Sequence, residues 1–189
     1  MRAARFPVDA LSVQYVLMDA TQATTFFGLI LIGATIGMLV ALTQASLRRS
    51  LAESGTELVA IVAVGATLGS LYLSEVANFV PCELCWFQRI AMYPIALIAT
   101  IAALRRDRAI LPYTFALSLI GLGISIYHIQ LQHFPDQSSF CEVANPCTSQ
   151  WVEAFGWMTI PQMAGISFAL IATISALAIR SLPEPKDLS

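Results

Sequence analysis

Long apolar runs alternate with short polar segments along most of the chain. Windows without Asp, Glu, Lys or Arg cover Ala20–Leu47, Leu58–Ser74, Ile90–Leu104, Ala109–Pro135 and Ala154–Ile179. A bilayer core of ~30 Å needs ~20 residues of helix, so the third run spans only if its helix also takes in residues before Ile90. The pattern predicts an all-α integral membrane protein with five spanning helices.

The first run stands apart from the other four. Residues 1–22 mix charged and apolar positions without a sustained period, which favours a tail or a surface helix. The run around Thr24–Gln44 is too long and too far from the start for a typical signal peptide, so we expect an uncleaved extra helix. We therefore divide the chain into a tail with the extra hydrophobic helix (1–50), a four-helix membrane domain (51–182) and a C-terminal tail (183–189). Ser50–Glu57 is expected to be a short polar connector.

Positive charges fall on one side of the predicted bundle. Seven basic residues follow the first, third and fifth runs, namely Arg48, Arg49, Arg105, Arg106, Arg108, Arg180 and Lys186. Alternating helices place all seven on the same side, which the positive-inside rule makes the cytoplasm. Arg2 and Arg5 then lie outside, against that trend. The net charge of −2 indicates no particular partner, and we expect no nucleic acid among them.

All four cysteines fall on the opposite side. The segments Glu75–Gln88 and Ile129–Ile160 contain no Lys or Arg and hold every cysteine of the chain. An even number of cysteines on the outer side is typical of a compartment in which disulfides persist. The charge pattern and the cysteine pattern therefore favour the same topology.

Cys82 and Cys85 form a Cys-x-x-Cys pair at the start of the third helix. One helical turn separates them, so their sulfurs can close into a disulfide with little rearrangement. A helix that begins near Pro81 places unpaired N–H groups and the positive end of the helix dipole beside the sulfurs, which favours a thiolate. Arg89 lies one turn deeper, where its charge stabilises a thiolate or a reduced anionic acceptor.

A second pair, Cys141 and Cys147, lies in the long loop Ile129–Ile160. Long loops of this kind are usually functional or disordered, and Asn145-Pro146 is a turn former that can bring the two sulfurs together. Four apolar residues further on share one helical face, namely Trp151, Val152, Phe155 and Met158. This pattern predicts a short interfacial helix that holds the loop near the Cys-x-x-Cys helix.

His128 lies at the outer end of the fourth helix, directly after Tyr127. Histidines and tyrosines at a membrane interface are most often anchors or hydrogen-bonded structural residues. Closeness to a redox pair is the argument for a functional role of His128. His133 lies in a polar stretch and is assigned no role.

Several interpretations of the cysteines compete. Two structural disulfides leave Arg89 unexplained, and a Cys-x-x-Cys loop is too short to restrict much chain entropy. A zinc site of four cysteines fits poorly with an oxidising compartment. Electron delivery from the cytoplasm needs cysteines within the membrane or accessible from inside, and the fourth and fifth helices contain none.

A relay of two disulfides accounts for both pairs, for Arg89 and for the long loop. The outer pair exchanges with a soluble thiol protein, and the membrane pair passes two electrons to a lipid-soluble acceptor. No flavin, haem or dinucleotide motif is present, so a membrane quinone fits by elimination and by location. Its ring would lie near Cys85 and Arg89. Three aromatic side chains are available as walls, or alternatively face lipid: Trp86, Phe87 and Tyr93.

The sequence resembles the disulfide-bond formation protein B (DsbB) family of bacterial thiol:quinone oxidoreductases, including its short-loop, Gram-positive-type relatives. Three segments carry the resemblance: Pro81–Pro94 with its Cys-x-x-Cys-x-x-x-Arg element, Tyr127-His128, and Gly156–Gln162. It covers roughly Leu58–Arg180. The resemblance implies a four-helix bundle in the bacterial cytoplasmic (inner) membrane with extracytoplasmic cysteine loops.

The resemblance also implies the activity. Such a protein reoxidises a periplasmic or extracytoplasmic thioredoxin-fold, DsbA-like dithiol oxidase and so supports disulfide formation in exported proteins. Its electron acceptor is a quinone, ubiquinone or menaquinone, and no metal takes part. On the donor side, Cys141 is attacked by the partner's thiolate, Cys147 receives the electrons, and Cys82 then exchanges with the loop pair.

On the acceptor side, the resemblance implies that Cys85 contacts the quinone as a thiolate. Arg89 binds a quinone oxygen, and His128 assists there. Trp86 is also expected at the quinone, as one of the aromatic walls named above rather than through the resemblance. Two features depart from the family pattern: the extra helix near Thr24–Gln44, and a closer spacing of the loop cysteines. A vitamin K epoxide reductase-like enzyme is the nearest chemical alternative, but that family places its loop cysteines before the membrane pair, and here the order is reversed.

Overall fold

The computed structural model describes residues 10–135, 141 and 145–181. Its helices are α1 (Ala10–Thr43), α2 (Ala45–Glu53), α3 (Gly55–Leu71), the π-helix η1 (Tyr72–Val76), α4 (Glu83–Arg105), α5 (Leu111–His133) and α6 (Ile160–Arg180), with the strands β1 (Glu153–Ala154) and β2 (Met158–Thr159). Five of the helical segments are long and apolar enough to cross a membrane. The prediction of an all-α membrane protein with five spans is confirmed.

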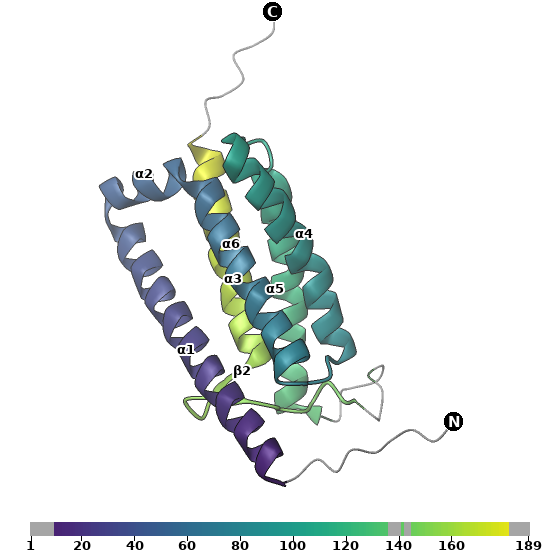
Figure 1. The fold of residues 1–189 in the computed structure, drawn as a ribbon. Helices are drawn as coiled ribbons and strands as arrows, with labels where there is room; N and C mark the ends of the chain where they lie inside the picture. The colour runs from purple at the N-terminus through teal and green to yellow at the C-terminus, as the bar shows by residue number, and fades with distance from the viewer. Residues whose placement is uncertain (1–9, 136–140, 142–144, 182–189) are drawn as a thin grey trace, which may run out of the picture.

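Helices α3 to α6 form the bundle (Figure 1). Its core is a continuous set of buried apolar side chains, including Val59, Ile95, Ala99, Phe168 and Ile171. A Cβ atom added at Gly121 of α5 would clash with the Phe168 ring of α6. Glycine at this position therefore lets α5 and α6 pack closely without displacing that ring.

Helix α1 lies along one side of the bundle, and most of its spanning part is exposed (Figure 1). A row of large apolar side chains faces outward, among them Phe26, Leu29, Ile30, Ile36 and Leu39. The expected boundary near residue 22 is wrong for residues 10–22, because they continue the same helix. No proline lies between Ala10 and Thr43, so nothing in this part of the sequence removes a backbone hydrogen-bond donor and interrupts the helix.

The expected connector over Ser50–Glu57 is also wrong in part. Residues 45–53 form helix α2, which crosses one end of the molecule, and α3 already begins at Gly55 (Figure 1). A Cβ atom at Gly55 would lie 2.5 Å from that of Ala178. The start of α3 therefore packs directly on the end of α6.

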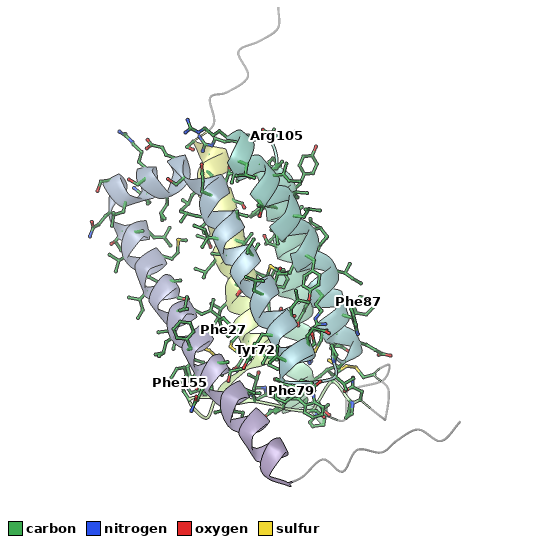
Figure 2. All side chains as sticks on the ribbon, viewed as in Figure 1. Phe27, Tyr72, Phe79, Phe87, Arg105 and Phe155 are labelled. Carbon is green, nitrogen blue, oxygen red and sulfur yellow. A yellow bond between two sulfur atoms is a disulfide. The ribbon has the colours of Figure 1, made fainter. Side chains whose placement is uncertain are left out.

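Apart from Arg89, the basic residues of the bundle lie at the end opposite the cysteines. Figure 2 shows Arg105 at one end and Phe79 at the other, beside the segment that leads into the cysteine pair. At the basic end, Nη2 of Arg108 donates hydrogen bonds to the Ala52 carbonyl (2.6 Å), the Ala178 carbonyl (3.1 Å) and the Ser181 hydroxyl (2.8 Å). One guanidinium thus joins the α4–α5 turn to two other helix ends.

The short interfacial helix predicted around Trp151–Met158 is wrong. The segment forms a hairpin in which Glu153 pairs with Thr159 and Ala154 with Met158. Phe155 and Gly156 have φ angles of 58° and 72°, and two consecutive residues in the left-handed region turn the chain back on itself. Spacing of three and four residues over so short a segment does not exclude a hairpin.

Candidate functional site

The Cys-x-x-Cys pair lies at the start of α4. Cys82 is the residue that caps the helix, and its sulfur accepts a hydrogen bond from the Cys85 backbone N–H at 3.4 Å. The two sulfurs are 2.8 Å apart, and both cysteines are free thiols. Cys82 is buried and Cys85 is partly exposed. The predicted position of the pair at the mouth of a helix is therefore correct, with the helix beginning two residues after Pro81.

Electrostatics at this pair favour a thiolate on Cys82. The hydrogen bond from the Cys85 thiol and, more weakly, the nearby His128 lower the pKa of Cys82 to about 4, although burial opposes the shift. In the reduced pair, Cys82 therefore carries the negative charge and Cys85 supplies the hydrogen bond. From the resemblance, Cys85 was expected to contact the acceptor as a thiolate. In the reduced pair of the structure, the thiolate is favoured on Cys82 instead.

His128 of α5 lies between the two cysteine pairs. Its Nε2 atom donates to the carbonyl oxygen of Cys147 at 3.0 Å and lies 3.7 Å from the Cys82 sulfur. The side chain is buried, and its Nδ1 atom has no hydrogen-bond partner among the described residues. His128 therefore adjoins the redox sulfurs, on the side of the loop pair.

Cys141 and Cys147 form a disulfide, with their Cα atoms 5.9 Å apart. They pack in one apolar cluster with Cys82, Cys85 and Leu131. A disulfide leaves neither sulfur as a thiolate ligand, so a four-cysteine zinc site does not fit this arrangement. The two pairs are adjacent in space, although more than fifty residues separate them in sequence.

The Asn145 side chain ties the loop to the Cys-x-x-Cys segment. The Asn145 amide donates a hydrogen bond to the Pro81 carbonyl at 2.9 Å. Asn145-Pro146 was predicted to turn the chain between the loop cysteines, and the disulfide agrees with that prediction. The amide contact adds a second function to the same residue, because it places the loop pair directly over the start of α4.

Arg89 is 9% exposed and lies one turn below Cys85. Its Nε atom donates to the Ser70 hydroxyl and its Nη2 atom to the Ser70 carbonyl, each at 2.9 Å. The guanidinium carbon is 5.2 Å from the centre of the Trp86 ring, within the range of a cation–π contact. The charge is therefore held in position by α3 on one side and by an aromatic ring on the other.

A cavity of about 120 Å³ adjoins Cys85 and Arg89 between α3, α4 and α6. This is comparable with the ~150 Å³ of a protein cavity that takes up benzene. Its walls are mainly apolar, including Phe79, Trp151, Met163 and Phe168, with Tyr93 and Gln88 as polar members. The Tyr93 hydroxyl is buried and has no hydrogen-bond partner among the described residues. The cavity thus suits a flat, apolar molecule with hydrogen-bond acceptors.

The structure divides the three aromatic residues proposed as walls. Tyr93 lines the cavity, whereas Trp86 and Phe87 do not, since Trp86 is 52% exposed and Phe87 is also exposed. Two other aromatic residues line the cavity with Tyr93: Phe79 and Trp151, whose stacked rings have their centres 5.6 Å apart. Sequence reasoning did not assign this pair to the site, and nothing local marks it, because the two residues come from different connections.

Fold and site together define a multi-pass helical membrane protein in which two cysteine pairs meet at one end of a four-helix bundle. The family model described as "Disulfide bond formation protein DsbB" matches residues 52–178. The chain belongs to this DsbB family, and its role is in disulfide formation as an oxidoreductase. The matched range contains all four cysteines and leaves α1 outside.

Curated relatives agree with this assignment. The chain is 44% identical over 133 residues to the "Probable disulfide formation protein" of Oceanobacillus iheyensis, covering 68% of this chain and 91% of the relative. It is 44% identical over 119 residues to the "Disulfide bond formation protein C" of Bacillus subtilis, covering 62% and 86%. A third relative, "Probable disulfide formation protein C" of Halalkalibacterium halodurans, is 44% identical over 123 residues, 64% of this chain and 89% of the relative. No solved structure matches significantly.

Proposed function

We propose that this protein is a membrane thiol:quinone oxidoreductase. It takes two electrons from an extracytoplasmic, thioredoxin-fold dithiol oxidase of the DsbA type and passes them to ubiquinone or menaquinone. The observation that carries the proposal is the contact of both cysteine pairs in one cluster, directly beside a cavity that contains Arg89. Electrons can move by exchange between neighbouring sulfurs, with no other redox group.

The donor side begins at Cys141, which is the sulfur that the partner's thiolate attacks. Cys141 is partly exposed, whereas Cys147 is 1% exposed, so a second protein reaches Cys141 more easily. The electron pair then passes to Cys147, whose backbone is held by His128 beside Cys82. Cys82 is the next sulfur to exchange, because it lies in the same cluster and is buried from external thiols.

The acceptor side is the cavity beside Cys85. A quinone supplies two-electron chemistry at its ring when bound. Arg89 donates a hydrogen bond to one of its oxygens and stabilises negative charge there, and the unpartnered Tyr93 hydroxyl is suited to bind an oxygen as well. Trp86 acts on the quinone through Arg89, whose guanidinium it covers. His128 acts on the sulfurs, because it lies at the loop side of Cys82.

The proposed location is the bacterial cytoplasmic membrane, with the cysteine end extracytoplasmic. The support is electrostatic: the arginine-rich turns all lie at the end opposite the cysteines, and such turns remain in the cytoplasm during insertion. This orientation also places the disulfides where they persist. The start of α1 at Ala10 then lies on the cysteine side of the membrane.

The test is quinone reduction by the purified protein in detergent, followed by ultraviolet absorbance, with a reduced thioredoxin-fold dithiol protein as donor. The expected result is donor-dependent reduction that is lost in Cys82→Ser and in Cys141→Ser. Ubiquinone and menaquinone analogues are compared in the same assay. Folded protein with its loop disulfide formed that reduces no quinone with any of several donors would contradict the proposal.

A further inference from the structure

Glu83 is a partly buried acid beside the loop disulfide. It is the first residue of α4, between the two cysteines of the membrane pair. One of its carboxylate oxygens and the sulfurs of Cys141 and Cys147 all lie within 4.8 Å of one another. Its Oε2 atom is buried and has no hydrogen-bond partner among the described residues. A buried polar atom without a partner destabilises a fold, so its position calls for a reason.

Opening the loop disulfide creates a need for a proton at this place. When the bond breaks, an electron pair is left on the sulfur of Cys147, which is 1% exposed. A buried thiolate has no water to stabilise it. His128 does not meet the need, because its Nε2–H donates to the backbone carbonyl of Cys147. The carboxyl group of Glu83 is the acid that the described structure places next to both loop sulfurs.

We propose that Glu83 is the proton-transfer group of the loop disulfide, an inference that rests on the exchange steps of the proposed function. A thiolate of the dithiol partner attacks the Cys141 sulfur, and a partner–Cys141 disulfide forms as the Cys141–Cys147 bond breaks. The electron pair passes to the Cys147 sulfur, and the carboxylic acid of Glu83 gives its proton to that sulfur. This proton hinders the reverse attack of Cys147 on Cys141.

The forward step restores the acid. The Glu83 carboxylate removes the proton from Cys147, whose sulfur attacks Cys82 in the oxidised membrane pair. A Cys147–Cys82 bond forms, the Cys82–Cys85 bond breaks, and its electron pair is left on Cys85. At this stage the partner is bound to Cys141, Cys147 is bound to Cys82, and Glu83 has returned to its starting state. The partner's second thiolate then attacks its own sulfur in the bond to Cys141, which forms the partner's disulfide and releases Cys141. The Cys141 sulfur attacks Cys147, which restores the loop disulfide and releases Cys82, so the membrane pair is left reduced by two electrons. A change of side-chain torsion or one water molecule is sufficient to span 4.8 Å.

A purely structural role explains less of the geometry. An acid in the first turn of a helix stabilises it through the helix dipole, and Glu83 is in that position. The dipole requires only a negative charge near the helix end, which an exposed carboxylate supplies equally well. It does not account for a carboxyl group that has one buried, unpartnered oxygen and lies within 4.8 Å of two sulfurs of another segment.

The test measures opening of the loop disulfide alone, without quinone. Oxidised full-length protein in detergent is treated with dithiothreitol, and alkylation of Cys141 and Cys147 is followed over time by peptide mass spectrometry. Glu83→Gln keeps the size of the side chain and removes its acid function, so we expect opening to be about 100-fold slower, at the lower end of general acid catalysis. Glu83→Asp, which keeps the acid, is expected to restore most of the rate, and the matched control Glu153→Gln removes an exposed carboxylate of β1 without effect.

A solvent isotope effect separates proton transfer from a structural role. The wild-type rate is expected to fall in D₂O, and this difference is expected to disappear in Glu83→Gln. An unchanged rate in Glu83→Gln, or a slower rate with the isotope effect retained, overturns the proposal. If Glu83→Gln does not fold, the isotope effect is measured on the wild-type protein alone. A wild-type rate of loop opening that is the same in H₂O and D₂O overturns the proposal. Quinone reduction by the wild type is measured separately, so failure there rejects the thiol:quinone function and leaves the role of Glu83 at the loop disulfide standing.

Discussion

At the scale of single residues, the site depends on polar atoms that connect separate segments. His128 joins the backbone of the loop pair to the sulfur of the membrane pair. Arg89 joins α4 to α3 through two bonds to Ser70. Each places a charge or a donor where chemistry on sulfur or on an acceptor needs it, and each gives a measurable prediction.

Replacing Cys147 tests the order of exchange. Cys147→Ser leaves Cys141 without its internal partner, so a reduced dithiol oxidase is expected to stay attached to Cys141 as a mixed disulfide. The measurement is a non-reducing gel, on which the adduct disappears after reduction. Cys141→Ser is the matched control and is expected to form no such adduct. Full turnover by Cys147→Ser would reject the assigned order.

Replacing Arg89 tests the acceptor site. A hydrogen bond from a charged group contributes about 1.5–3 kcal/mol, so Arg89→Ala is expected to raise the apparent KM for quinone by roughly 10- to 100-fold. The rate of loop opening by dithiothreitol is expected to stay unchanged, since Arg89 does not contact the loop cysteines. Ser70→Ala, which removes the side-chain acceptor of Arg89, is expected to give a smaller increase of the same kind. A defect confined to exchange with the thiol partner would contradict the assignment.

The low pKa of Cys82 predicts how the reduced pair depends on pH. Because the folded-state pKa is about 4 and lies below the ordinary thiol value of 9.0, the thiolate is present from neutral pH down to about pH 5 and is lost as the pH falls through 4. The measurement is thiolate ultraviolet absorbance of the reduced, quinone-free protein. His128→Ala removes one of the causes of the shift, so its midpoint is expected to lie higher. A wild-type midpoint near the ordinary value would contradict the described geometry.

At the scale of elements, the extra helix α1 packs against the segment that follows the loop disulfide. A Cβ atom at Gly28 would lie 2.9 Å from the Phe155 ring and 3.2 Å from the Met158 sulfur. Ala20 of α1 also belongs to the buried cluster that contains Phe79 and Val152. Phe79 forms part of the cavity wall, so α1 supports the acceptor site from behind, although it lies outside the family match.

Enlarging Gly28 tests this support. Gly28→Leu forces a side chain into the hairpin contact, and overpacking of this kind costs about 1–3 kcal/mol. We expect a lower thermal midpoint in detergent and a raised KM for quinone, with donor exchange unchanged. Gly33→Leu is the matched control, because a Cβ atom there meets nothing within 4 Å. Equal behaviour of the two variants would show that α1 does not support the site.

At the scale of the whole molecule, the arginine-rich turns lie at the end opposite the cysteines, and Arg108 links the helix ends there. Arg108 donates to the ends of α2 and α6 and to Ser181. Nη2 carries two hydrogens, which the three acceptors share, so two hydrogen bonds at about 1 kcal/mol each predict that Arg108→Ala lowers the free energy of unfolding by about 2 kcal/mol. The measurement is thermal unfolding in detergent, with the exposed Arg105→Ala as control. An equally small loss of stability in Arg108→Ala and Arg105→Ala would show that the Arg108 hydrogen bonds do not hold the helix ends together.

The local pattern of residues was sufficient to predict the five spans, the opposite placement of arginines and cysteines, and the Cys-x-x-Cys pair one turn above Arg89. These features depend on composition and on spacing within one helix, which act over short distances along the chain. The same reasoning failed over residues 151–158, where a segment of eight residues fits a helix and a hairpin about equally well. The left-handed backbone at Phe155 and Gly156 selected the hairpin.

Only the tertiary structure decided which side chains meet at the site. It placed His128 between the cysteine pairs, the Phe79–Trp151 stack at the cavity, and Glu83 against the loop sulfurs. These contacts join segments that lie up to about 70 residues apart, and they arise from how helices and connections pack together. Local hydropathy determines that a segment enters the membrane, but packing between distant segments determines what each sulfur and each charge faces.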